Sequence, residues 1–387
     1  MSPSPSPLPT ACTPTVFPIS GTHDPHSVRR GPGLLLSGAG LLGVPVSAVQ
    51  WLRSHLGGAT GRAGNVVILS ASGGREDEDA LYRDARFASV QEIFIPPCAD
   101  SEAVDAMATY VNGADAVLFA GGDQANYARW KGSALIRAVQ AVYAHGGFVG
   151  GGSAGLAIQG ALGYDSVAAD RLHPGDDDYA VTTQNALHNP FEPEISFASL
   201  FAWPALGNTI TDTHFGVRNR FGRLVAFLAR IVHDKLGPTP YYGLGVDEGS
   251  VVLVGPDGTA TVRKKPQSRG AYLIRLDGQV VMRAASPLRT IVDVAHIGRD
   301  GEPFDLLHKR PGVPWTRVQV DGAQAPFYRP DPYSLADYRG RQRATAVRSK
   351  RRRAACADSA APNRTSAANT TDSVKPKALV QHAYSLP

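Results

Sequence analysis

The middle of the chain alternates between short apolar runs and segments with helical spacing, and this alternation limits the folds that it can adopt. Strands that are apolar on both faces, each followed by a helix, form a parallel sheet covered on both sides. We therefore predict an α/β fold with right-handed crossovers, in which ligands lie beyond the carboxyl ends of the strands. The expected strands are 34–37, 66–69, 92–95, 116–119 and 147–150, and the expected helices are 46–56, 77–88, 102–111, 126–144 and 154–161.

Both ends of the chain differ in composition from the middle. Residues 1–32 contain eight prolines among serines and threonines, a composition that buries too little apolar surface to offset the entropy of ordering. Residues 339–387 hold eleven Lys or Arg and two Asp or Glu, so this tail contributes +9 to a net charge of +5 and the remainder carries −4. We predict that 1–32 and 339–387 are disordered, that 33–310 is one α/β domain, and that 311–338 packs on it or is irregular.

The cysteines and the apolar runs bound the class of protein. Cys12, Cys98 and Cys356 are scattered without a C-x-x-C pair, so we expect neither a disulfide framework nor a cysteine-based zinc site. No run is long and apolar enough for a transmembrane helix. We expect a cytoplasmic protein that needs no cofactor and no metal.

An export signal is the alternative for localisation. Arg29 and Arg30 precede an uncharged stretch over 33–52, and a twin-arginine pair before an apolar region is typical of such signals. Four glycines and Pro45 interrupt this stretch, however, and it also suits a strand followed by a helix. We therefore prefer to interpret it as part of the fold.

The most informative motif follows the strand predicted at 147–150. It reads Gly151-Gly152-Ser153-Ala154-Gly155 ahead of a helical pattern, a G-x-S-x-G in the strand–turn–helix context that exposes a nucleophilic serine. The N-terminus of the next helix faces the oxygen that develops charge. We predict that Ser153 is a nucleophile, with the N–H groups of Ala154 and Gly122 as oxyanion donors. The alternative is a glycine-rich turn in which the serine only caps a helix.

A serine nucleophile needs a base and a group that orients the base. Among eleven histidines, His214 differs because Asp212 lies two positions before it on a strand-like segment, and so on the same face. Arg218, Arg220 and Arg223 follow. Buried unpaired cations are costly, so these arginines imply anionic partners. Their positive charges also help to keep the nearby histidine neutral. A solvated helix face is the alternative for the arginines.

The acidic partner of the histidine stays open among three residues. A strand predicted at 242–246 ends in Asp247-Glu248, and another strand follows at 250–254. A carboxylate at a strand end is able to reach a histidine at a neighbouring strand end. We choose Glu248 as the acidic partner, with Asp247 and Asp212 as competitors. The alternative for the Asp247-Glu248 pair is a surface turn.

These motifs, in this order, resemble those of cyanophycinase and its relative peptidase E, an aspartyl dipeptidase. The likeness spans about 33–307, and the arginine-bearing motif favours cyanophycinase. It implies a flavodoxin-like sheet of the class I glutamine amidotransferase type with a β-rich C-terminal part, in which Ser153 attacks, His214 is the base and Glu248 orients it. The implied substrate-binding residues are Gln124, Asp212, Thr213, Arg218, Arg220 and Arg223.

The resemblance also implies a substrate. Cyanophycin is a poly-aspartate chain with arginine on each side-chain carboxyl, and cyanophycinases are serine exopeptidases that release β-aspartyl-arginine dipeptides from it. An aspartyl or isoaspartyl dipeptidase on the same fold is the alternative. We further expect the long stretch before His214 to cover the pocket with the aromatic side chains Phe191, Phe197, Phe201 and Trp203, while the acidic run 176–178 is more simply a solvated loop.

A non-catalytic function is the second alternative. The basic run 348–353 is able to bind nucleic acid or another polyanion by releasing counterions. We favour a solubilising tail, and we expect no membrane partner. The assembly state is open, with a homodimer as one option.

Overall fold

We analysed a computed structural model, which describes residues 12–57, 61–73, 81, 86–174, 179–278 and 280–335. Most of the predicted helix 77–88 lies outside these residues, as do the acidic run 176–178, the tail 339–387 and Cys356. Within the described part, no helix is both long enough and apolar enough to cross a membrane.

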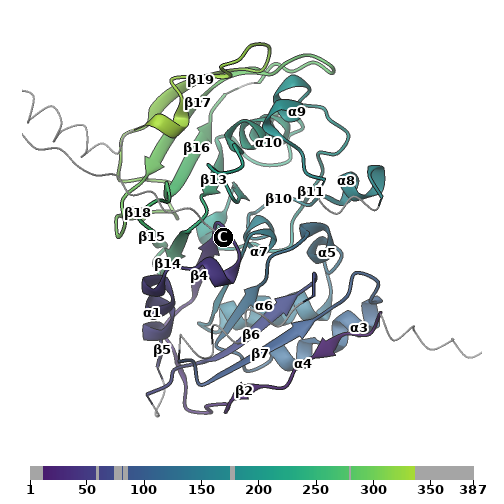
Figure 1. Ribbon diagram of the computed structural model, residues 1–387, viewed down its shortest axis with the longest axis vertical. Helices are drawn as coiled ribbons and strands as arrows, with labels where there is room; N and C mark the ends of the chain where they lie inside the picture. Colours follow the sequence, from purple (N-terminus) through teal and green to yellow (C-terminus); the bar gives the residue numbers. More distant parts are fainter. Residues whose placement is uncertain are drawn as a thin grey trace, which may run out of the picture. The chain divides into compact units, whose positions relative to one another are not determined.

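The main sheet has a parallel centre, as the sequence predicted (Figure 1). Its strands follow the order β7-β6-β8-β9-β4, and each pair along this path is parallel. Antiparallel strands extend it on both sides, with β1 and β2 on β7, and β14, β15 and β18 beyond β4. The strands are β1 Thr15–Val16, β2 Ser20–Gly21, β4 Gly33–Ser37, β6 Asn65–Ser70, β7 Ser89–Phe94, β8 Ala116–Phe119, β9 Phe148–Gly152, β14 Ser250–Val254, β15 Thr259–Lys264 and β18 Pro303–Asp305.

Helices cover this sheet on both faces because its strands are apolar on both faces. Alternate residues of β4 show this directly: Leu34 and Leu36 belong to one buried cluster, whereas Leu35 belongs to another. The first cluster includes Val139 of α6, and the second includes Leu52 of α1. The helices are α1 Val46–His55, α3 Ser101–Ala106, α4 Ala108–Val111, α5 Gln124–Ala128, α6 Ala134–Ala144 and α7 Ala154–Ala157.

The helix predicted over 126–144 is two helices, α5 and α6. α5 ends at Ala128, and Gly132, in the turn between the two helices, has a φ of +78°, a left-handed conformation that suits glycine. Ser133 then starts α6, since its hydroxyl accepts a hydrogen bond from Ile136 N at 3.1 Å. A cap inside a periodic apolar pattern is easily overlooked.

A second sheet follows in the chain and accounts for the β-rich C-terminal part. Its order is β12-β13-β16-β17-β19-β20, with β12 and β13 parallel and the other pairs antiparallel. Helix α10 (Phe221–His233) packs against β13 and β16, and α9 (Thr183–His188) packs against α10 (Figure 1). The strands are β12 Thr209–Asp212, β13 Tyr241–Val246, β16 Ala271–Leu276, β17 Arg289–Ile297, β19 Thr316–Asp321 and β20 Tyr328–Arg329.

The prediction of a disordered lead is wrong for residues 12–32. Strands β1 and β2 pair with β7, and β3 (Val28–Arg29) pairs with β5 (Leu56–Gly57). The side chain of Asn65 bonds the backbone of Asp24 in both directions at 2.9 Å, and Arg29 Nε donates to Asp115 Oδ1 at 2.8 Å. The open edge of β7 supplies the backbone partners of β1 and β2, and polar side chains hold the rest of the segment. Residues 12–32 therefore order without a large apolar surface.

The structure corrects one further expectation about the first hundred residues and agrees with another. Cys12 and Cys98 form a disulfide, 86 positions apart, because the pairing of β1 with β7 brings the two segments together. The uncharged stretch 33–52 forms β4 and most of α1. Its removal as a signal would take away the strand between β9 and β14.

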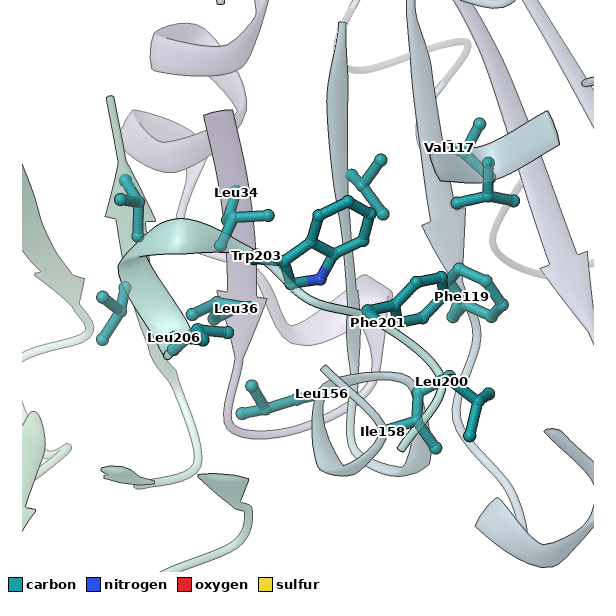
Figure 2. Close-up of a cluster of buried hydrophobic side chains, with 14 of the residues drawn as sticks. Leu34, Leu36, Val117, Phe119, Leu156, Ile158, Leu200, Phe201, Trp203 and Leu206 are labelled. Carbon is teal, nitrogen blue, oxygen red and sulfur yellow. The ribbon is translucent and has the colours of Figure 1, made fainter. Parts of the chain in front are cut away.

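The aromatic residues expected to cover the pocket lie partly in the core instead. Phe201 and Trp203 are buried and stacked with ring centroids 4.7 Å apart, and they pack with Phe119 and Leu34 (Figure 2). The indole of Trp203 donates to Gln159 Oε1 at 2.9 Å. Phe201 and Trp203, in the segment before β12, therefore belong to the hydrophobic core. Aromatic composition alone does not distinguish a core segment from one that covers a pocket.

Candidate active site

Ser153 stands at a sharp bend between β9 and α7. Its φ of +52° is unusual for a residue with a side chain, and such strain is held only where the surroundings over-determine it. Small neighbours make the bend possible, since a Cβ on Gly152 would come within 2.2 Å of Ala39 O and one on Gly155 within 2.2 Å of Phe119 O. The strand–turn–helix context expected from the sequence is therefore present.

His214 faces this serine from the loop after β12. Its Nε2 lies 2.7 Å from Ser153 Oγ, although the two residues are 61 positions apart. The imidazole is 7% exposed, and its backbone N–H donates to Gly38 O at 2.8 Å. Its φ of +47° is also left-handed, so both residues of the pair occupy strained backbone.

Glu248, at the end of β13, contacts the other nitrogen of the ring. Its Oε1 lies 2.5 Å from His214 Nδ1, which places the proton on Nδ1 and leaves Nε2 to accept from the serine. Asp247 has a different task, because its buried Oδ1 accepts from Gly216 N at 2.8 Å and Val217 N at 3.2 Å. Of the three carboxylates that the sequence left open, only Glu248 contacts the imidazole.

The environment of His214 favours its neutral form. Burial lowers the pKa of the imidazole, and the positive charges of Arg218 and Arg220 lower it further, against the raising effect of the Glu248 carboxylate. A general base must be unprotonated to accept a proton, so this lowering suits that role near neutral pH.

Ser153 and His214 open onto a cavity of about 920 Å³. Gly122 and Ala154, the expected oxyanion donors, also line it. The strand β8 that ends before Gly122 pairs with β9, as expected, and Gly121 lies so close that its Cβ would be 3.6 Å from the Ser153 Cβ. Gly122 has a φ of +126°, a conformation open to glycine.

All three arginines line the cavity, but Arg220 and Arg223 are buried and bonded within the protein, whereas Arg218 is exposed. Arg223 donates two hydrogen bonds to the Asp212 carboxylate, from Nε to Oδ2 at 2.8 Å and from Nη2 to Oδ1 at 2.5 Å. Arg220 Nη1 donates to the Thr213 hydroxyl at 2.8 Å, and burial followed by the charge of Arg223 lowers its pKa to about 9. Arg218 is exposed to the cavity and, within the described residues, its side chain forms no hydrogen bond or ion pair.

Asp212 is placed differently from the expectation for a substrate-binding residue. It is 2% exposed and is not among the residues that line the cavity. Burial by itself would raise the pKa of its carboxyl, but Arg223 and Arg220 outweigh burial and hold the pKa below its usual value. Asp212 therefore orients two arginines and does not face a substrate directly.

Gln124 lines the cavity together with residues that the sequence did not single out. Its Nε2 donates to Ser166 Oγ at 2.6 Å. The far wall comes from the insertion after α7, in which His173 stacks on Tyr179 with centroids 3.7 Å apart and bonds Glu194 at 3.0 Å. No sequence motif marks these residues. They line the cavity because they lie in or near α8 (Val167–Leu172) in the folded chain.

Comparisons with known proteins identify structural neighbours only. The chain matches no family model and no curated protein. Among solved structures, a peptidase from an acI-B1 Actinobacterium is similar at 16% identity with a TM-score of 0.43, over 73% of this chain and 98% of that one. A peptidase E candidate from Listeria monocytogenes EGD-e is similar at 13% identity with a TM-score of 0.38, over 60% and 98%. We therefore base the functional argument on the geometry of the site.

Proposed function

We propose that this protein is a serine-type exopeptidase that cleaves cyanophycin into β-aspartyl-arginine dipeptides. The observation that carries the catalytic part is the line of contacts from Ser153 Oγ through His214 to Glu248, at 2.7 and 2.5 Å. The first distance lies within the range of about 2.6–3.2 Å required of a nucleophile and its base, and the second is slightly shorter, as in a hydrogen bond to a charged carboxylate.

The reaction proceeds in two halves. His214 Nε2 takes the proton of Ser153 as Oγ attacks the aspartyl carbonyl, and the carbonyl oxygen becomes an oxyanion that the N–H groups of Gly122 and Ala154 stabilise. The C–N bond breaks, the leaving amine receives the proton from His214, and an acyl-ester remains on Ser153. Water, deprotonated by His214, then hydrolyses this ester and restores the serine.

The charge of the cavity supports the choice of substrate. Arg218 offers an exposed guanidinium near the catalytic pair, which suits an α-carboxylate. Asp123 brings a carboxylate to the same cavity, as does Asp170, which is paired with Arg129 at 3.6 Å. A cyanophycin unit carries both a carboxylate and a guanidinium, so it matches this division. An α-aspartyl dipeptide carries its positive charge as an α-ammonium close to the scissile bond, whereas cyanophycin carries guanidinium groups at the ends of long side chains.

The test combines product analysis with one substitution. We expect the purified protein to release β-aspartyl-arginine from cyanophycin, and Ser153→Ala to lower kcat by roughly 10⁴ to 10⁶ while folding normally. Ser286→Ala, a half-buried serine whose hydroxyl donates to Ala284 O, is the matched control. Full activity of Ser153→Ala would exclude the mechanism. Hydrolysis of aspartyl dipeptides alone would exclude cyanophycin and leave the serine mechanism in place.

A further inference from the structure

The loop that carries the catalytic histidine is held in an unfavourable backbone conformation. It runs from β12 to α10, and both His214 (φ +47°) and Asn219 (φ +48°) are left-handed. Residues with side chains occupy this region only when neighbouring groups impose it. The position of the imidazole therefore depends on the contacts that this loop makes with other elements.

Side chains from three separate elements bond the backbone of this loop. Asp247 accepts from Gly216 N and Val217 N, as described above. The Thr183 hydroxyl of α9 donates to Asn219 O. The third contact comes from the C-terminal extension, at the far end of the described chain.

Tyr333 supplies this third contact, and its hydroxyl joins the two ends of the loop. It accepts from Phe221 N, the first residue of α10, at 2.9 Å, and it donates to Phe215 O at 3.3 Å. Phe215 directly follows His214. A single oxygen thereby fixes the start of the turn relative to the helix behind it, across more than a hundred positions of sequence.

Tyr333 is itself held firmly. It lies in the short helix η4 (Pro332–Ser334), where Asp331 Oδ1 accepts from its backbone N–H at 3.1 Å. Its ring packs 6.1 Å from that of Tyr272 and beneath the guanidinium of Arg269 at 5.8 Å. Burial raises the pKa of its phenol well above the usual range, so the hydroxyl keeps the proton that it donates.

We propose that Tyr333 is a positioning residue of the active site, which holds His214 opposite Ser153 by joining Phe215 O to Phe221 N. This inference rests on the proposed function of the Ser153–His214 pair. It gives the extension 311–338, for which the sequence indicated no function, a part in catalysis without contact to the substrate.

The test is the rate at which a fluorophosphonate labels Ser153, because this rate needs the serine and its base but not the natural substrate. We expect Tyr333→Phe to lower the labelling rate by about tenfold to a hundredfold, the scale of a misplaced catalytic group. Tyr272→Phe is the matched control. It removes a buried hydroxyl from the same aromatic cluster, and this hydroxyl has no hydrogen-bond partner among the residues that the structure describes. It should label at the rate of the unaltered protein.

The pH dependence of labelling separates positioning from a general loss of stability. Burial is the largest cause that lowers the pKa of His214, and a loosened loop admits water to the imidazole, so the pH at half-maximal labelling should rise in Tyr333→Phe. Wild-type rate and wild-type midpoint in this variant would overturn the proposal. If Tyr333→Phe does not fold, the same two readouts are measured for Asp331→Ala. Asp331 is exposed and accepts the hydrogen bond from Tyr333 N, so this substitution loosens η4.

Failure of the proposed function would give a different result. In that case the unaltered protein and Ser153→Ala would be labelled equally slowly, whatever residue occupies position 333. A protein in which Ser153 is labelled rapidly, but equally so with and without the Tyr333 hydroxyl, keeps the serine mechanism and loses only the positioning role.

Discussion

The two sheets contribute to the candidate site in different ways. The parallel sheet presents Ser153 and Gly122 at the ends of adjacent strands β9 and β8, where short turns lead directly into helices. The second sheet presents His214 and Glu248 through loops that several distant elements hold. The nucleophile thus depends on local backbone geometry, whereas its base depends on long-range contacts.

The largest expected effect tests whether the two sheets form one catalytic unit. We expect Ser153→Ala, His214→Ala and the double variant to lower kcat by a similar factor, roughly 10⁴ to 10⁶, because residues that act together are not additive. His308→Ala, an exposed histidine paired with Asp305, is the control. A double variant much slower than either single one would show that the serine and the histidine act independently.

A pair of glycine substitutions compares how tightly the two sheets are packed. In β9, a Cβ on Gly150 would lie 1.9 Å from Leu35 O, a backbone atom, whereas in β13 a Cβ on Gly243 would lie 3.0 Å from the Leu224 side chain. We expect Gly150→Ala to lower the free energy of unfolding by about 3 kcal/mol or more and Gly243→Ala by about 1 kcal/mol. Urea unfolding of both variants measures this difference, and equal losses would contradict it.

The smallest effect concerns the influence of the arginine loop on the base. Because the pKa of His214 is lowered, kcat/KM should fall as the pH drops through a midpoint below about 6.5, the usual value for histidine. Arg218→Leu removes one of the charges that lower this pKa, so the midpoint should rise by less than about one pH unit. A pH profile of kcat/KM in which the midpoint stays or falls would show that Arg218 has no such influence.

The parallel sheet was largely predictable because its information is local. The apolar runs at 34–37, 66–69 and 116–119 lie within β4, β6 and β8, and Gly-x-Ser-x-Gly marked the bend at Ser153. The lead was not predictable, because the edge of β7 and the Asn65 side chain order residues whose own composition favours disorder.

The acidic partner and the roles of the arginines were less predictable. The sequence left Glu248, Asp247 and Asp212 open, because their distances to the imidazole depend on how β12 and β13 pair. It also suggested that all three arginines face a substrate. In the structure, all three arginines line the cavity, but Arg220 and Arg223 are buried and paired with Asp212, and Arg218 is the exposed one of the three.

The sequence alone determined the α/β class, the serine at its bend and the histidine segment, since each depends on residues close together in the chain. Tertiary structure decided which carboxylate meets the imidazole, which arginine is exposed, and how the C-terminal extension reaches the histidine loop. These are contacts between residues tens to more than a hundred positions apart. Their geometry comes from the packing of strands and helices, and no local pattern in the chain records it.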